Sequence, residues 1–191
     1  MHMTPIGKAS VHILGTIVEK KENRGGLNVI VSVDDKRYAT FIRKTDTKRL
    51  EIVKNFDVGE MVEITAYIKN NVYEKSNGEQ KVSFDFHLQK IFRASGALEF
   101  IQFNVVGEPI KFETKQTSTG VSYQVAYLKT TLNSGEEVFI NVIHKPLNDK
   151  IDISKYATKD GFLIHSTGDI CRDDNKEYIF KARIVGECTR Q

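Results

Sequence analysis

The sequence predicts an all-β protein built from two five-stranded barrels in tandem, each with one short helix. Three observations predict this fold: apolar and polar residues alternate with a period of two in ten segments, one helical spacing interrupts the first five, and the same order of elements returns in the second half. The chain has 191 residues, which is enough for two domains of about 95 residues, each with its own core.

Alternation in the first half predicts strands separated mostly by turn-forming residues. Between the third and fourth strands, Leu50, Ile52 and Val53 have the spacing of a short amphipathic helix over Thr47–Phe56, which Asp57-Val58-Gly59 closes. The order is therefore β-β-β-α-β-β. The five predicted strands are Val11–Lys20, Asn28–Val33, Arg37–Lys44, Met61–Lys69 and Lys81–Phe92.

The second half repeats this order after the joint at Ser95-Gly96, which predicts domains at residues 1–95 and 96–191. A weak helix or turn is expected over Leu147–Tyr156. The predicted strands of this half are Ile101–Phe112, Val121–Leu132, Glu137–His144, Phe162–Ile170 and Glu177–Val185.

The two halves also match in sequence letters, which favours duplication of one domain. The segment Gly59–Ile68 can be laid over Gly161–Ile170 without a gap, and Phe41 falls on Phe139. Polar hairpin tips precede the fifth strand in both halves. Any two antiparallel domains can be aligned loosely, which is the alternative interpretation.

Five strands with a helix between the third and fourth is the order of the OB-fold, a Greek-key barrel. The segment Asp57–Ile68, a turn and a glycine entering an alternating strand, resembles the fourth strand of bacterial and phage single-stranded DNA-binding proteins, and Lys159–Ile170 resembles it more closely. Bacterial members usually end in an acidic tip that recruits partners, whereas this sequence ends with Gly186–Gln191. The resemblance therefore implies a phage, plasmid or divergent member.

The predicted strand Arg37–Lys44 carries the most informative face. Alternation places Ala39 and Phe41 on one face together with Arg37 and Arg43, while Tyr38, Thr40 and Ile42 share the other. An apolar core does not accept two guanidinium groups, so the first face is expected to line an open groove, with Phe41 as a stacking platform. In the other interpretation Phe41 is core and the arginines reach water from the strand ends.

Charge favours the first half as the principal binding site. Residues 1–95 hold 16 Lys and Arg against 12 Asp and Glu, whereas residues 96–191 hold 12 against 13. Further candidate residues of the first half are Lys20, Lys21 and Arg24 beside Gly25-Gly26, Lys36, Lys44 and the Lys69–Lys75 hairpin with Lys69, Tyr73 and Lys75. Candidates for an auxiliary site in the second half are Lys115, Tyr123, Tyr127, Lys129 and Phe139.

No motif for catalysis, metal binding or a cofactor is recognisable, and the dispersed histidines are interpreted as structural. The sequence therefore predicts a non-enzymatic, cytoplasmic protein that binds single-stranded DNA without sequence preference during replication, recombination or repair. Replication or recombination proteins and a second copy of the chain are its expected protein partners. RNA binding and a protein-binding adaptor role are the alternatives that the sequence leaves open.

Overall fold

The computed structural model describes residues 8–74, 78, 80–96, 98–132, 134–144, 163–172 and 177–188 of the chain. The backbone forms two compact units, a first one of Ser10–Gln102 and a second one that contains Phe103–Gln191. The predicted boundary at Ser95-Gly96 stays a prediction. The helix α1 (Thr47–Lys54) has eight residues, and no helix in the described part of the chain is long and apolar enough to span a membrane.

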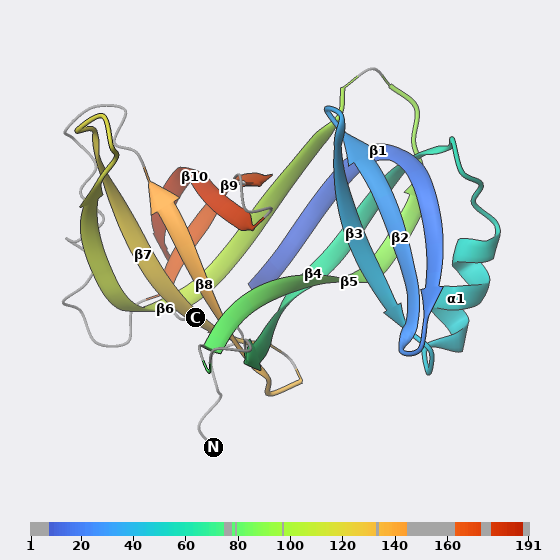
Figure 1. Ribbon diagram of the computed structural model, residues 1–191, viewed down its shortest axis with the longest axis horizontal. Coiled ribbons are helices and arrows are strands. Elements are labelled where there is room, and N and C mark those ends of the chain that lie inside the picture. The colour runs from blue at the N-terminus through green and yellow to red at the C-terminus, as the bar shows by residue number, and fades with distance from the viewer. Residues whose placement is uncertain are drawn as a thin grey trace. The chain divides into compact units, whose positions relative to one another are not determined.

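The first unit is a closed five-stranded barrel with one helix (Figure 1). Its strands are hydrogen-bonded in the order β2-β3-β5-β4-β1, and a further pairing of β2 with β1 closes the ring. Among the strand pairings of this unit that the structure describes, only that of β3 with β5 is parallel. The elements are β1 (Lys8–Asn23), β2 (Gly26–Val33), β3 (Lys36–Arg43), α1 (Thr47–Lys54), β4 (Met61–Glu74) and β5 (Gln80–Arg93).

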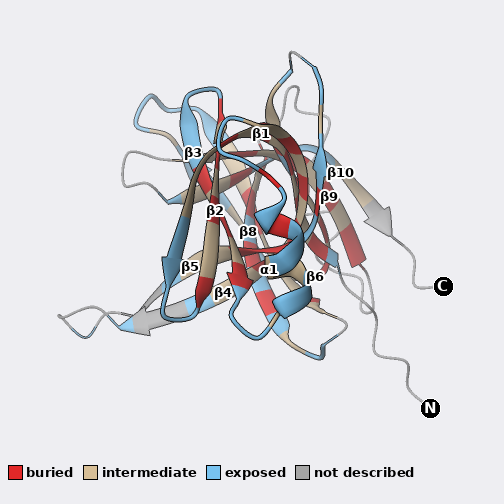
Figure 2. Ribbon diagram, turned by 90° about the vertical axis from the view of Figure 1, so that its right-hand side faces the viewer, coloured by how far each residue is buried: buried red, intermediate tan, exposed pale blue. Residues whose placement is uncertain are grey.

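Strict alternation along the strands builds the core of the first unit (Figure 2). In β3, Tyr38, Thr40 and Ile42 are buried while Arg37 and Arg43 are exposed, so the strand turns its apolar side inward as predicted. The burial of Val53 in α1 ties the helix to the same core. The predicted elements of this half are confirmed, with one correction. The segment predicted as a Lys69–Lys75 hairpin is strand up to Glu74, because β4 and β5 continue to pair there.

The second unit repeats the topology of the first. Its strands are hydrogen-bonded in the order β6-β7-β8-β10-β9, and β6 also pairs with β9 to close the ring. The parallel pair is again third with fifth, β8 with β10. The weak helix or turn expected over Leu147–Tyr156 lies outside the described residues. The strands are β6 (Phe100–Gln116), β7 (Ser122–Thr131), β8 (Glu137–His144), β9 (Leu163–Arg172) and β10 (Tyr178–Cys188).

Matching β-bulges fix which residues of the two units are equivalent. The register of β1 against β2 shifts between Ile17 and Glu19, and that of β6 against β7 shifts between Pro109 and Lys111. A bulge inserts one residue and resets every later pair, so equal bulges define a common frame. The fourth and fifth strands of each unit also share an irregularity. The register of β4 against β5 shifts after Thr65, and that of β10 against β9 shifts after Ala182. The two barrels therefore share irregular features as well as strand order.

This common frame supports one sequence match and corrects the other. Tyr67 pairs with His87 and Asp169 pairs with Lys181, in agreement with the gapless match of Gly59–Ile68 to Gly161–Ile170 over its described part. The match of Phe41 to Phe139 is wrong. Phe41 pairs with His87 in the parallel ladder, and Ile143 pairs with Lys181 there, so Ile143 is the equivalent of Phe41.

Two glycines allow the first two strands of each barrel to approach closely. A Cβ on Gly15 would lie 2.2 Å from the backbone oxygen of Ser32, and one on Gly107 would lie 2.8 Å from that of Lys129. These glycines occupy equivalent places, three residues before the bulge in β1 and in β6. A side chain at either position would force the two strands apart.

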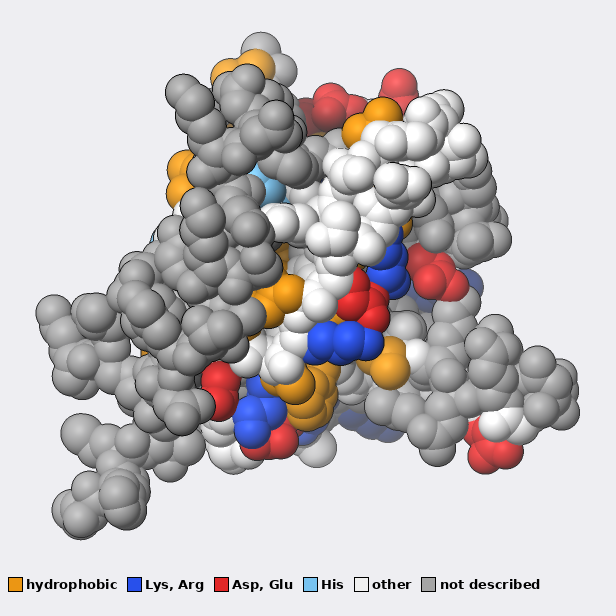
Figure 3. All heavy atoms as spheres, turned by 90° about the vertical axis from the view of Figure 1, so that its left-hand side faces the viewer, with side chains coloured by type: hydrophobic (Ala, Val, Ile, Leu, Met, Phe, Trp, Pro, Cys, Tyr) orange, Lys and Arg blue, Asp and Glu red, His pale blue; other side chains and the backbone are white. Residues whose placement is uncertain are grey.

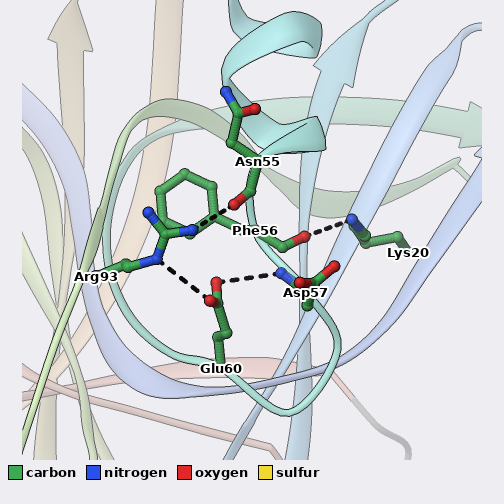
Figure 4. Close-up of polar contacts among 6 residues, drawn as sticks. All are labelled: Lys20, Asn55, Phe56, Asp57, Glu60 and Arg93. Carbon is green, nitrogen blue, oxygen red and sulfur yellow. Dashed lines mark hydrogen bonds and ion pairs between the residues drawn. The ribbon is translucent and has the colours of Figure 1, made fainter.

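A polar clasp holds the end of α1 against the barrel (Figure 4). The Arg93 guanidinium donates to the carbonyl of Asn55 at 2.5 Å and pairs with the Glu60 carboxylate at 3.2 Å, and it lies 5.0 Å from the ring centre of Phe56. Lys20 donates to the carbonyl of Phe56 at 2.5 Å. The backbone N–H of Asp57 donates to Glu60 and, with Arg93, lowers the pKa of that carboxyl. The hydrogen bonds of this clasp satisfy the carbonyl groups that follow α1 and so hold the end of the helix against the barrel.

His144 predicts a pH dependence for the stability of the second unit. This side chain is 3% exposed, and its Nδ1 has no hydrogen-bond partner within the described part of the chain. Burial lowers the pKa of His144 below 6.5, so the unfolded chain binds more protons than the native one as the pH falls past that value. The native state therefore loses stability from there toward its own lower pKa.

Thermal unfolding at pH 7.5 and pH 5 tests this dependence. We expect the wild-type protein to melt at a lower temperature at pH 5, and the variant His144→Leu to show a smaller difference between the two pH values. An equal difference in both proteins would contradict the assignment to His144.

Candidate nucleic-acid interface

One row of residues crosses the outer face of the first barrel. Pairing joins Lys21 to Asn28, Asn28 to Phe41, Phe41 to His87 and His87 to Tyr67, across all five strands. The strand neighbours of Phe41, His87 and Tyr67 are buried, so these three rings face away from the core. We call Phe41, His87 and Tyr67 the aromatic row.

The three rings of the aromatic row contact one another. His87 is stacked on Tyr67 with a centroid distance of 5.2 Å and an interplanar angle of 18°. It meets Phe41 edge to face at 5.3 Å and 87°. His87 itself is only 8% exposed, whereas Phe41 and Tyr67 are half-buried. His87 therefore packs between Phe41 and Tyr67 and holds these two more accessible rings in position.

A pocket of about 460 Å³ opens at the aromatic row. The three rings, Arg43 and the start of α1 are among the residues that line it. Asp46 caps this helix by accepting from the backbone N–H of Arg49 at 3.2 Å, and the Arg49 guanidinium contacts the same carboxylate. Arg49 also donates to the carbonyl of Gln89 at 3.0 Å. The helix start is therefore fixed beside the rings.

The exposed cations Arg43 and Lys48 line this pocket, and Lys44 lies between lining residues of the chain. Arg24 is also exposed and precedes Gly25, which lies beside the Phe41 ring. Within the described residues, Arg24, Arg43, Lys44 and Lys48 form no ion pair. The loop that contains Arg24 lies beside the aromatic row. The Gly25 carbonyl accepts a hydrogen bond from the backbone N–H of Lys44 at 2.8 Å, and a Cβ placed on Gly25 would lie 3.4 Å from the Phe41 ring. Cations with no acidic partner are available to phosphate groups.

The remaining predicted residues of the first half lie in different places. Lys69 lies 5.6 Å from the ring centre of Tyr67 and is therefore next to the aromatic row. Lys36 and Arg37 lie at the opposite end of β3 from Arg43, where Arg37 is 3.9 Å from Glu19, so the structure does not bring them to the pocket. The Tyr73 side chain and the whole of Lys75 lie outside the described residues.

Sequence reasoning missed Tyr67 and His87. Alternation along β4 gives the outward direction of Tyr67, and that signal was available in Met61–Lys69. The neighbourhood of Phe41, His87 and Tyr67 depends on the pairing of three strands that are not consecutive in the chain. No spacing in the sequence encodes that pairing.

Lys and Arg side chains lie next to Asp and Glu side chains on the face that Figure 3 shows, and the candidate cations of the second unit are paired in the same way. Lys115 lies 3.1 Å from Glu113, and Lys129 lies 3.3 Å from Glu137. Tyr127 donates its hydroxyl to Glu113 at 2.6 Å, and Tyr123 pairs in the ladder with Lys115. Phe139 is 47% exposed and pairs with Lys129. It therefore does not belong to the row of the second unit that corresponds to the aromatic row. The cations predicted here are therefore neutralised.

The described part of the chain contains no group of three His, Cys, Asp or Glu side chains that could hold a metal ion. The candidate interface consists of rings and cations. Such a set can stack on flat apolar groups and pair with anions.

Comparison with known proteins gives no match to a family model and none to a curated protein sequence. Solved structures do match. A deletion variant of the single-stranded DNA-binding protein from Thermus aquaticus has a TM-score of 0.68 at 15% identity, covering 97% of both chains. The wild-type form of that protein gives 0.67 at 15% identity, covering 97% of this chain and 95% of the other. The chain therefore shares its fold, two OB barrels in one polypeptide, with a single-stranded DNA-binding protein.

Proposed function

We propose that this protein binds single-stranded DNA without sequence preference, through the aromatic row and the cations beside it. The observation that carries the proposal is the contact of Phe41, His87 and Tyr67 on the outer face of a barrel. Bases of any sequence present a flat face, so two accessible rings held by a third can stack on successive bases. The shared fold with a single-stranded DNA-binding protein supports the same function.

The electrostatic part of the proposal rests on Arg24, Arg43, Lys44 and Lys48. They are exposed and carry no ion pair within the described part of the chain, so a phosphate group displaces no protein carboxylate when it binds them. Each cation that contacts a phosphate releases a condensed counterion from the strand. The affinity must therefore fall as salt is added.

Fluorescence anisotropy of labelled oligo-dT at several NaCl concentrations tests the proposed function. We expect log K to fall linearly against log[NaCl] with a slope of about −3, because each phosphate contact on a single strand contributes about −0.7. Duplex DNA and an RNA oligomer of the same length serve as competitors. Absence of oligo-dT binding at low salt would remove the proposal and favour the protein-binding adaptor, and tighter binding of RNA would reassign the ligand.

We further propose, from the sequence resemblance, that the protein acts on exposed strands during replication, recombination or repair, in the host cytoplasm if a phage or plasmid encodes it. Replication or recombination proteins and a second copy of the chain are its proposed partners. The domains 1–95 and 96–191 are proposed as the two folding units. Limited proteolysis and sedimentation of the full chain test the last two points.

A further inference from the structure

The second barrel carries a different set of residues in the row that holds the rings of the first. Equivalence follows from the shared bulges and strand pairs. In the first unit, β1 contributes Lys21 to this row, whereas in the second unit β6 contributes Glu113 at the same place. The complete row of the second unit is Glu113, Val125, Ile143, Lys181 and Asp169.

Glu113 is surrounded by the cations of its own unit. Its carboxylate contacts the ammonium groups of Lys111 and Lys115, the latter at 3.1 Å, and accepts a hydrogen bond from the Tyr127 hydroxyl at 2.6 Å. Lys115 also donates to that hydroxyl at 3.3 Å, and Lys111 lies 5.7 Å from the Tyr127 ring centre. Two ammonium groups and a hydroxyl around one anion form the kind of contact set that a phosphate group takes.

The charge state of this cluster is stable across the physiological range. Lys111, Tyr127 and Lys115 lower the pKa of Glu113 to about 2, and Glu113 raises the pKa of both lysines. Glu113 therefore stays ionised at every pH at which the protein is expected to work. A phosphate group that binds Lys111 and Lys115 must therefore displace the ionised Glu113 carboxylate.

We propose that Glu113 is an affinity-lowering residue that occupies the phosphate position of the second barrel and keeps Lys111 and Lys115 from the nucleic-acid backbone. The proposal rests on the proposed function and deepens it. It makes the two barrels unequal in strength: the first holds the strand, and the second contacts it weakly and releases it readily.

The variant Glu113→Gln tests this inference in the full-length protein. Glutamine keeps an acceptor for the Tyr127 hydroxyl but removes the charge, so both lysines become available. We expect the affinity for an oligo-dT long enough to reach both barrels, about 30 nucleotides, to rise about tenfold at low salt, because single OB folds cover about 4–16 nucleotides. The salt slope should steepen by about 1.4, or about 0.7 for each lysine.

Glu108→Gln is the matched control. Glu108 lies on the same strand β6, is exposed, and makes no ion pair in the described part of the chain, so it changes the net charge equally without touching the two lysines. It should raise the affinity far less. Adding Lys111→Ala and Lys115→Ala to Glu113→Gln should abolish the gain and the extra slope.

The outcomes separate the two proposals. If the wild-type protein binds oligo-dT but Glu113→Gln leaves the affinity and the salt slope unchanged, the proposed role of Glu113 is wrong while the proposed function stands. A gain of equal size in Glu108→Gln would also overturn it, since the effect would then be one of net charge. If the wild-type protein does not bind at low salt, the proposed function falls and this inference falls with it. Melting curves of each variant show that it is folded.

Discussion

Replacing both Phe41 and Tyr67 by alanine is expected to weaken oligo-dT binding by roughly 30- to 2×10⁴-fold, because each of the two bases stacked on a ring contributes about 1–3 kcal/mol. Both rings lie against His87 on the outer face of the first barrel, so their loss removes stacking without opening the core. Fluorescence anisotropy at fixed salt measures the change. The salt slope should stay close to that of the wild-type protein, since Arg43 and the other cations remain.

Phe92→Ala is the matched control for the aromatic row. Phe92 lies on β5 of the same barrel and is 56% exposed, but it belongs to a different row, where it pairs with Glu63. We expect its removal to change the affinity by less than about twofold, since no stacked base would be lost. Equal losses in this control and in the double variant would mean that the aromatic row has no special part in binding.

Gly15→Val is expected to destabilise the first barrel by about 3 kcal/mol or more, because overpacking a closed interior forces backbone shifts. The new Cβ would lie 2.2 Å from the Ser32 carbonyl oxygen and under 3 Å from the side chains of Val31 and Val33. A typical domain is stable by only about 5–15 kcal/mol, so much of the margin is lost. Urea unfolding followed by circular dichroism measures the loss, and oligo-dT binding should weaken at the urea concentration that unfolds the first barrel.

Gly186→Val separates this effect from the general cost of a larger side chain. Gly186 lies in β10, and a Cβ placed there meets nothing within 4 Å. Its replacement should change the unfolding free energy by no more than about 1 kcal/mol, and the sign is expected to be stabilising, because valine restricts the unfolded chain. If Gly15→Val proved as mild as Gly186→Val, the close approach of β1 and β2 would be contradicted.

The outward direction of Phe41 could be predicted from sequence because charge limits what a strand may bury. Arg37 and Arg43 stand at even spacing from Phe41, and a guanidinium group is costly to bury unpaired. The structure agrees: Tyr38 and Ile42 are each 2% exposed, while the two arginines lie in water. Period-two alternation likewise located the ten strands, because each barrel strand has one wet and one dry face.

The composition of the aromatic row could not be predicted, because it depends on which strands pair and in which register. β3 contacts β5, which lies more than 35 positions later in the chain, and a bulge opposite Thr65 and Ala66 displaces the remaining pairs by one. The same effect explains the wrong match of Phe41 to Phe139. Both are outward-facing phenylalanines on the third strand of a barrel, but the pairing places Phe139 four residues away from the equivalent position.

Charge counting predicts the principal binding site in the first half, which stays a prediction, and it could not show how the cations of the two halves are paired. The sequence shows more basic than acidic residues only in the first half. The structure adds that Lys115 and Lys129 each lie beside a carboxylate, whereas Arg43 and Lys44 do not form an ion pair within the described residues. Ion pairing depends on cross-strand neighbours, and composition does not record them.

Photo-crosslinking is the most direct test of the claim that the aromatic row holds the strand. An oligo-dT substituted with 5-iodo-deoxyuridine is bound to the full-length protein and irradiated, and the attached peptides are identified by mass spectrometry. We predict attachment at Phe41 and Tyr67, and unlabelled oligo-dT should compete it away. Attachment confined to residues of the second barrel, in a protein that binds the oligonucleotide, would contradict this claim.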